Sequence, residues 1–268
     1  MMVKDLRHFL AAHSASVLVE VAEAKGSTPR DAGTIMLVAP NSLLGTIGGG
    51  QLEYLAIDHA RRILAGETLP LTLDIPLGPE IGQCCGGRTL IGFRVVDAGI
   101  AAEVEGRLQY EMAGAPEVMV FGAGHVGLAL ARALAPLPLK VTLIDSRPAI
   151  DGEAPRDITF RRVAMPEAEV GTLQAGSAVV ILTHDHALDF LVAREALSRG
   201  DLAYVGMIGS KTKRATFSSF LRQEGLSPSL LDQLTLPIGG SDVRDKRPAV
   251  IAALVAAELL GVLLKKRP

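Results

Sequence analysis

The sequence predicts an α/β protein of two domains, on three observations. Its 268 residues are enough for about two domains of ordinary size. After residue 117, short apolar strands alternate with helices, the pattern of a doubly wound parallel sheet. Before residue 98, short turns join the strands, as in an antiparallel sheet. We therefore expect an N-terminal α+β domain over residues 1–97, a linker helix over 98–116 and a Rossmann-like domain over 117–268.

The first domain should hold one hairpin and one amphipathic helix. Pro40 and Asn41 turn the chain between two apolar strands, which makes the hairpin. Apolar residues recur at helical spacing after the glycines at 48–50, which indicates a helix. In chain order, the expected elements are a helix at 3–12, strands at 16–24, 34–39 and 43–47, a helix at 51–65, and strands at 69–75 and 88–96.

The second domain should alternate strands and helices along its length. The linker ends in Gly114, Ala115 and Pro116, residue types that suit a domain boundary. Between residues 146 and 177 the pattern is variable and predicts no regular element. The expected strands lie at 117–121, 140–145, 178–183, 203–207 and 234–237, and the helices at 125–135, 187–199, 211–224 and from 248 onward.

The composition disfavours two classes of partner. Lys and Arg number 27 and Asp and Glu 29, and the net charge of −2 argues against binding nucleic acid. There is no Trp and only 4% of residues are aromatic, so no base-stacking surface is expected. The longest apolar stretch, 248–264, contains Glu258 and is too short for a membrane span. With a charged N-terminus and only two, adjacent cysteines, we expect a cytoplasmic protein with no membrane partner.

A glycine-rich turn after the strand at 117–121 matches a dinucleotide-binding fingerprint. Gly122 permits the tight turn, Gly124 lets a phosphate approach the backbone, and Gly127 lets helix and strand pack closely. His125 lies within this turn. Free N–H groups at the start of the helix would bind a pyrophosphate. The alternative is that these glycines serve the fold alone and bind nothing.

An acidic residue follows the fingerprint at the expected distance. Asp145 closes the next strand, 18 residues beyond Gly127. It would accept hydrogen bonds from a ribose diol and repel a 2′-phosphate, so a cofactor bound here would be NAD-like rather than NADP-like. Arg147, two residues further on, weakens that preference. The fingerprint therefore leaves open NAD, another nucleotide or no ligand.

A second glycine turn lies in the first domain. Three consecutive glycines precede the helix at 51–65 and would offer backbone N–H groups as an anion nest. The alternative is a joint between hairpin and helix that needs positive φ angles. An arginine after an upstream proline turn suits phosphate or carboxylate, and is otherwise an ordinary surface residue. The candidate binding residues here are Arg30, Gly48, Gly49, Gly50, Gln51 and Glu53.

Two adjacent cysteines lie in a glycine-rich segment between two strands. Cys84 and Cys85 follow Gln83, and flexible backbone on both sides indicates accessible thiols. The nearby Arg88 would favour the thiolate, which is the nucleophilic and metal-binding form. Soft sulfur suits thiophilic metals and sulfur transfer. The alternative is that the pair fills a gap in the core as two small hydrophobic residues.

A His-Asp-His tripeptide lies where the strand at 178–183 ends, at the edge where open α/β sheets place their ligands. His184 and His186 alternate, so they would point to one side and share a metal, contact a ligand, or act as acid and base. The alternative makes Asp185 an N-cap and leaves the histidines partly solvated. No third metal ligand is evident, so no metal site is predicted.

Seven short motifs occur in a fixed order along nearly the whole chain. Together they resemble the XdhC/CoxI family, accessory proteins of xanthine dehydrogenase and related molybdenum hydroxylases. Several motifs in order are far more specific than any one of them. The motifs are GSTPRDAG (26–33), IGGGQLE (47–53), GQCCGG (82–87), VFGAGHVG (120–127), LIDSRP (143–148), THDHALD (183–189) and YVGMIGSKTKR (204–214).

The resemblance implies a chaperone for molybdenum cofactor and not an enzyme. Such a protein would bind the molybdopterin form of the cofactor transiently and hold it while a cysteine desulfurase installs the sulfido ligand. It would then insert the cofactor into a xanthine dehydrogenase-type molybdoenzyme. A homodimer and a Rossmann-like C-terminal domain are also implied. The cofactor would contact the two glycine turns, the cysteine segment and residues 184–186.

Two alternatives of other classes stay open from the residues. One is an NAD-dependent oxidoreductase, with Asp145 on the ribose and the imidazole of His184 or His186 as proton donor. The other is a redox- or nucleotide-sensing regulator that delivers no cofactor. Only a delivery factor would raise the activity of an apo-molybdoenzyme supplied with free cofactor.

Overall fold

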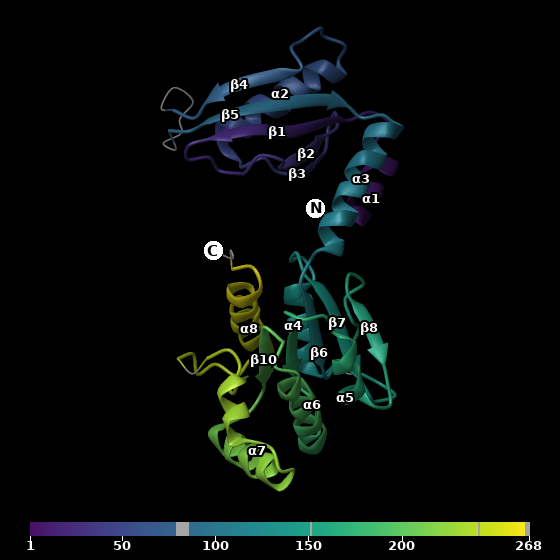
Figure 1. Cartoon of the computed structure of the whole chain (residues 1–268). Helices are drawn as coiled ribbons and strands as arrows, with labels where there is room; N and C mark the ends of the chain where they lie inside the picture. Colours follow the sequence, from purple (N-terminus) through teal and green to yellow (C-terminus); the bar gives the residue numbers. More distant parts are fainter. Residues whose placement is uncertain (79–85, 151, 241, 266–268) are drawn as a thin grey trace. The chain divides into compact units, whose positions relative to one another are not determined.

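The computed structural model describes residues 1–78, 86–150, 152–240 and 242–265. The chain divides into two compact units, Met1–Ala113 and Gly114–Pro268, here called unit 1 and unit 2. Figure 1 shows the helices and strands of both units. Unit 1 is an antiparallel sheet with helices, and unit 2 a six-stranded parallel sheet with helices, so the predicted fold class is confirmed.

Unit 1 has one antiparallel sheet with helices on both faces. The sheet order is β3-β2-β1-β5-β4, with β1 at the centre paired to β2 and β5. The elements are α1 (Val3–Ala12), β1 (Val17–Lys25), β2 (Ile35–Val38), β3 (Leu43–Gly45), α2 (Gly50–Leu64), β4 (Thr72–Pro76), β5 (Arg88–Val95) and α3 (Ala98–Ala113).

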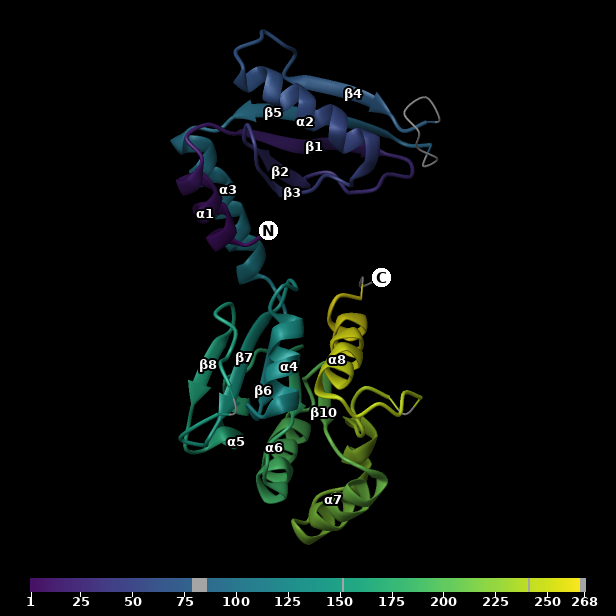
Figure 2. The same ribbon diagram turned by 180° about the vertical axis from the view of Figure 1, so that it is seen from behind.

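Alternation along β1 explains why both faces of this sheet are covered. Val17, Val19 and Val21 belong to the apolar cluster that holds Leu52 of α2, while Leu18 packs in the cluster of α1 and α3. Figure 2 shows α2 lying along one face of the sheet. The helix that the sequence assigns to a linker, α3, buries Val104 and Leu108 in that second cluster, and these contacts group it with unit 1.

Unit 2 is a three-layer α/β/α arrangement. Its parallel sheet has the order β11-β10-β9-β6-β7-β8. Among the described residues, none of its helices combines the length and apolarity that a membrane crossing needs. The elements are β6 (Glu117–Phe121), α4 (His125–Leu134), β7 (Lys140–Asp145), β8 (Thr159–Arg162), α5 (Pro166–Glu169), β9 (Ala178–Ile181), α6 (His186–Arg199), β10 (Tyr204–Met207), α7 (Lys211–Gln223), β11 (Leu234–Thr235) and α8 (Pro248–Leu263).

Alternate side chains of β6 point to opposite faces of this sheet. Val118 and Val120 pack with α4 and α8, whereas Met119 and Phe121 pack with α6 and α7. The order reverses between β6 and β9, the switch point at which such sheets open a crevice at their carboxyl edge. The strand β8 and the helix α5 lie in the stretch where the sequence predicts no regular element.

Candidate functional site

A large pocket opens at the carboxyl edge of the sheet of unit 2, and we call it the carboxyl-edge pocket. It has a volume of about 1150 Å³ and is lined from the first turn of α4, the segments after β9, β10 and β11, and the start of α8. Its apolar wall includes Val126, Phe190, Ile208, Ile238 and Ile251. These segments follow strands of one parallel sheet, so the fold itself places them together.

A buried ion pair forms part of the wall of this pocket. The ammonium of Lys213 pairs with the carboxylate of Asp189 and donates to the carbonyl of Ile208 at 3.0 Å. The side chain of Lys213 is 9% exposed and that of Asp189 is fully buried. The other carboxylate oxygen of Asp189 accepts from the N–H of Thr183 at 3.0 Å and from its hydroxyl at 2.7 Å. The network ties the end of β9 to α6 and α7.

The segment before α8 adds charged groups to the pocket. Arg244, Asp245 and Lys246 all line it. Asp245 already has a partner, because the guanidinium of Arg247 donates to both of its oxygens: Nε to Oδ1 at 3.1 Å, and Nη2 to Oδ2 at 2.6 Å. In the part of the chain that is described, Arg244 and Lys246 make no hydrogen bond or ion pair, so two cations face the pocket without a protein partner.

The glycine turn of unit 2 lies where the sequence predicts it, and two of its three glycines are required by packing. Gly122 has φ +109°, and a Cβ there would lie 2.3 Å from the carbonyl oxygen of Leu182. A Cβ on Gly127 would lie 1.8 Å from the carbonyl oxygen of Gly122. Gly124 is the N-cap of α4, which begins at His125 and has no capping side chain. The fold therefore needs Gly122 and Gly127 whether or not a ligand is bound.

The carboxylate of Asp145 accepts hydrogen bonds from neighbouring residues of the same unit. Its carboxylate, 4% exposed, accepts from the N–H of Ala123 at 2.6 Å and the N–H of Arg147 at 2.8 Å, and the Arg147 guanidinium donates to it as well. Burial raises the pKa of Asp145, but the bonds from Arg147 and Ala123 outweigh it, so the pKa lies below its ordinary value. The cavity beside Asp145 and Gly122 has a volume of only about 10 Å³.

The three side chains of the His-Asp-His tripeptide lie in three different environments. The carboxylate of Asp185 accepts from the N–H of Ala187 at 2.8 Å and is the N-cap of α6, the alternative given above. His186 lines the carboxyl-edge pocket, whereas His184 lines the small cavity beside Asp145. Among the described residues, no group of three or more His, Cys, Asp and Glu could hold a metal ion.

The second glycine turn, in unit 1, is occupied by the protein's own carboxylate. Glu53 accepts from the N–H groups of Ile47 and Gly49, both at 3.1 Å, and from the hydroxyl of Thr46. Gly48, Gly49 and Gly50 have φ angles of +129°, +78° and +63°, as a joint between hairpin and helix requires. Gln51, in the first turn of α2, is exposed. Of the three glycines, Gly49 thus donates to Glu53, a carboxylate of the same chain, and Gly48 donates to the hydroxyl of Thr46.

Three motifs of unit 1 meet at one end of its sheet. A Cβ on Gly48 would lie 2.7 Å from Pro29, and one on Gly87 would lie 2.2 Å from the carbonyl oxygen of Ser27. These close approaches join the GSTPRDAG turn to the glycine turn and to the end of the cysteine segment. Arg30 lines a cavity of about 370 Å³ that Arg107 and Glu111 of α3 also line.

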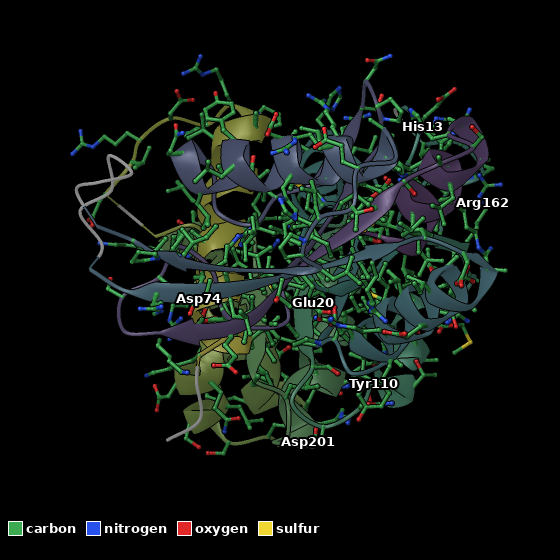
Figure 3. The ribbon with its side chains drawn as sticks, turned by 90° about the horizontal axis from the view of Figure 1, so that it is seen from above. His13, Glu20, Asp74, Tyr110, Arg162 and Asp201 are labelled. Atoms are coloured by element: carbon green, nitrogen blue, oxygen red, sulfur yellow. The ribbon has the colours of Figure 1, made fainter. Side chains whose placement is uncertain are left out.

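Of the motif GQCCGG (82–87), only Gly86 and Gly87 lie within the described residues. Gln83, Cys84 and Cys85 lie outside the described residues. Arg88, the cation expected to favour a thiolate, donates to both oxygens of Asp74 at 2.6 and 2.7 Å. Asp74 is labelled on β4 in Figure 3. The guanidinium of Arg88 is thus engaged in an exposed ion pair across the β4–β5 ladder.

Sequence reasoning missed the charged groups of the carboxyl-edge pocket. Lys213 belongs to the motif YVGMIGSKTKR, but the sequence alone gave it no role. The sequence did contain a signal for the position of Lys213. Ser210 is a residue type that favours the N-cap, which places Lys213 in the first turn of the helix that follows. Arg244 and Lys246 lie in a loop of no recognisable pattern, and only the fold brings them to the same pocket as Lys213.

Comparison with known proteins gives consistent matches over both units. The "XdhC Rossmann domain" model matches residues 118–259, more than half of the chain, and the "XdhC and CoxI family" model matches residues 9–74. The uncharacterized protein YqeB of Escherichia coli K12 is 27% identical over 256 residues, which cover 91% of this chain. The match covers 43% of YqeB, so this chain spans less than half the length of that relative.

A solved structure shares the fold of the whole chain. A protein of Bacillus halodurans, described as a xanthine dehydrogenase, superposes with a TM-score of 0.78, covering 100% of this chain and 97% of that one. The sequence identity is 19%, so this likeness concerns the fold alone. The family is shown by the models, and it confirms the resemblance drawn from the seven motifs. The chain belongs to the XdhC and CoxI family.

Proposed function

We propose that this protein is an accessory factor of a xanthine dehydrogenase-type molybdoenzyme that binds the molybdopterin form of molybdenum cofactor in its carboxyl-edge pocket. Membership of the XdhC and CoxI family implies the accessory role. The cofactor part of the proposal is carried by the pocket itself. It offers about 1150 Å³ with apolar walls and a few charged groups, at the edge where parallel sheets take their ligands.

The residues present fit a phosphorylated pterin. A pterin ring is flat, and the apolar side chains of Val126, Phe190 and Ile238 offer surfaces on which it can lie. His186 and Thr212 line the same pocket and can bond the polar edge of the ring. The cations of the pocket complement the phosphate. The cofactor is cargo here, and this chain's residues supply only its binding and orientation.

The proposed sequence of events includes two partners. The protein holds the cofactor while a cysteine desulfurase supplies the sulfur for the sulfido ligand, and then passes it to the apo-molybdoenzyme in the cytoplasm. We assign Cys84 and Cys85 a role in the sulfuration or delivery of the cofactor, on the chemical ground that thiolates are ligands for thiophilic metals. A homodimer is part of the proposal, drawn from the family resemblance.

The test is reconstitution of an apo-xanthine dehydrogenase with free, anaerobic molybdenum cofactor, with and without this protein. The proposal expects the protein to raise the yield of active enzyme several-fold, and a matched amount of albumin to leave it unchanged. The Cys84→Ser/Cys85→Ser variant should still bind cofactor but deliver less active enzyme. Equal yields with this protein and with albumin would reject the proposal.

The same preparations separate the proposal from its main alternative. An NAD-dependent oxidoreductase would oxidise or reduce the nicotinamide on its own, which is measured by the near-ultraviolet absorbance of NADH. The accessory factor should show no such turnover in the absence of the molybdoenzyme. The engaged carboxylate of Asp145 supports this expectation, because a ribose diol would have to displace Arg147 or Ala123 from it.

A further inference from the structure

We propose that the carboxyl-edge pocket binds a phosphate monoester, and that Lys213, Arg244 and Lys246 are its binding residues. The proposal deepens the function proposed above and relies on it for the identity of the organic part, a pterin. It assigns the phosphate to the α7 side of the pocket and not to the glycine turn at α4. The reasons are the charge balance, the geometry of Lys213 and the state of the glycine turn.

The charge balance of the pocket favours a dianion. The charged residues of its lining are Lys213, Arg244, Lys246 and Asp245. Their ion-pair partners are Asp189 and Arg247. Four cations against two carboxylates leave two positive charges without compensation. A phosphate monoester carries about −1.5 to −2 at pH 7 and would neutralise them.

The ammonium group of Lys213 is fixed in position and has one N–H group available for a ligand. An ammonium group has three N–H donors. Two are used within the protein, on Asp189 and on the carbonyl of Ile208. The third has no acceptor among the described residues, and Lys213 lines the pocket. Because the side chain is only 9% exposed and already fixed, a phosphate bound to it costs little side-chain entropy.

Arg244 and Lys246 supply the remaining charge from the segment before α8. Both are exposed, and neither has a hydrogen-bonding partner in the described part of the chain. A guanidinium can bond two phosphate oxygens at once, and an ammonium adds a point charge. Their neighbour Asp245 does not cancel them, since it is paired with Arg247.

The glycine turn at α4 is the less suitable place for the phosphate. The N–H of Ala123, in the middle of the turn, is already bonded to Asp145 at 2.6 Å. The N–H of Gly122 is bonded to the carbonyl of Ile144 at 2.7 Å. The first turn of α4 contributes Val126 to the pocket, an apolar side chain that suits the ring better than the phosphate. The ligand therefore lies with its ring toward α4 and its phosphate toward α7.

The test measures binding of two probes to the full-length protein by fluorescence. The first probe is the oxidised, fluorescent pterin phosphate obtained from molybdenum cofactor, and the second is the same pterin after phosphatase treatment. The proposal expects the phosphorylated probe to bind at least about tenfold more tightly than the second. Raising the salt concentration should weaken the first probe more than the second.

Paired variants then locate the phosphate. Arg244→Gln/Lys246→Gln should reduce the preference for the phosphorylated probe to within about twofold. Lys211→Gln/Arg222→Gln removes the same charge from two positions on α7 that do not line the pocket, and should keep the preference. Asp189→Asn/Lys213→Gln replaces the buried ion pair by two neutral amides, so that no lone charge is buried, and should also lose the preference.

Each outcome bears on the proposal. A preference that survives in Arg244→Gln/Lys246→Gln, or that is absent from the unmodified protein, overturns it. The reconstitution of apo-enzyme is run on the same samples. Phosphate-dependent binding without reconstitution supports the phosphate site and rejects the delivery function. Reconstitution without any phosphate preference rejects the phosphate site and supports the delivery function.

Discussion

The carboxylate of Asp145, at the end of β7, accepts a hydrogen bond of 2.6 Å from the N–H of Ala123 in the glycine turn after β6. The two neighbouring strands are thereby tied together at the edge where a dinucleotide would lie. Arg147 covers the same carboxylate, with its backbone N–H at 2.8 Å. In this chain the acid after the fingerprint thus stabilises the turn.

Asp145→Ala should destabilise unit 2. The change leaves the N–H of Ala123 and the guanidinium of Arg147 without their acceptor, at a cost of about 2–4 kcal/mol. Urea unfolding at neutral pH measures it. Asp201, labelled in Figure 3, is the matched control, because it pairs with Arg199 while 42% exposed. Its change to Ala should cost about 1 kcal/mol or less, and equal effects at both sites would contradict the structural role of Asp145.

The contribution of Asp145 should also depend on pH. Its pKa in the folded protein lies below the ordinary value because of the bonds from Arg147 and Ala123. The stability gained from its ionised form is therefore complete above a pH of about 5 and is lost as the pH falls through about 4 toward the folded pKa. The stability difference between the unmodified protein and Asp145→Asn should shrink over that range. Urea titrations at several pH values test this, and a difference that stays constant would refute it.

NAD should not stabilise the protein. A ligand that binds only the folded state raises the free energy of unfolding by about 2.7 kcal/mol at a concentration one hundred times its Kd. With the carboxylate of Asp145 engaged and only about 10 Å³ beside it, we expect no rise in Tm on adding millimolar NAD or NADH. Thermal unfolding measures this, with a phosphorylated pterin as the comparison ligand. A clear rise with NAD would restore the oxidoreductase alternative.

Most of the fold follows from local patterns in the sequence. The helix at α1, the alternation of β1 and the strand–turn–helix at β6 and α4 each carry a periodic signal that neighbouring residues set. Two elements do not. The strand β8, with only Phe160 partly buried among its four residues, and the four-residue helix α5 are held by contacts with β7 and α6, which a local pattern does not encode.

The site was only partly predictable, for a physical reason. Consecutive or regularly spaced glycines predict a turn, but the sequence does not show which groups accept hydrogen bonds from the N–H groups of that turn. In both units the protein's own carboxylate does so, Asp145 in one and Glu53 in the other. Conversely, Lys213 and Arg244 are thirty-one positions apart and share a pocket only because β10, β11 and α8 bring them together. A ligand set made by tertiary structure leaves no spacing signal.

Gly127→Ala should be severely destabilising, because the new Cβ would lie 1.8 Å from a backbone carbonyl oxygen that no rotamer can move. We expect a loss of at least about 3 kcal/mol. Gly261→Ala is the matched control in the same unit, since a Cβ there meets nothing within 4 Å and lies within α8. It should raise stability by about 0.5 kcal/mol. Thermal and urea unfolding of both variants decide the point, and a mild effect at Gly127 would contradict the close packing described.

Glu53→Ala should open the glycine turn of unit 1. The N–H groups of Ile47 and Gly49 would lose their acceptor and would exchange with solvent far faster, because the turn has no other carboxylate on these groups in the described structure. The unsatisfied, buried N–H of Ile47 would cost about 1–3 kcal/mol. Amide hydrogen exchange over residues 46–50 measures the first effect and urea unfolding the second. Glu67→Ala, which removes only an exposed partner of Arg62, should change neither. If exchange at 46–50 stays slow without Glu53, the carboxylate is not what orders this turn.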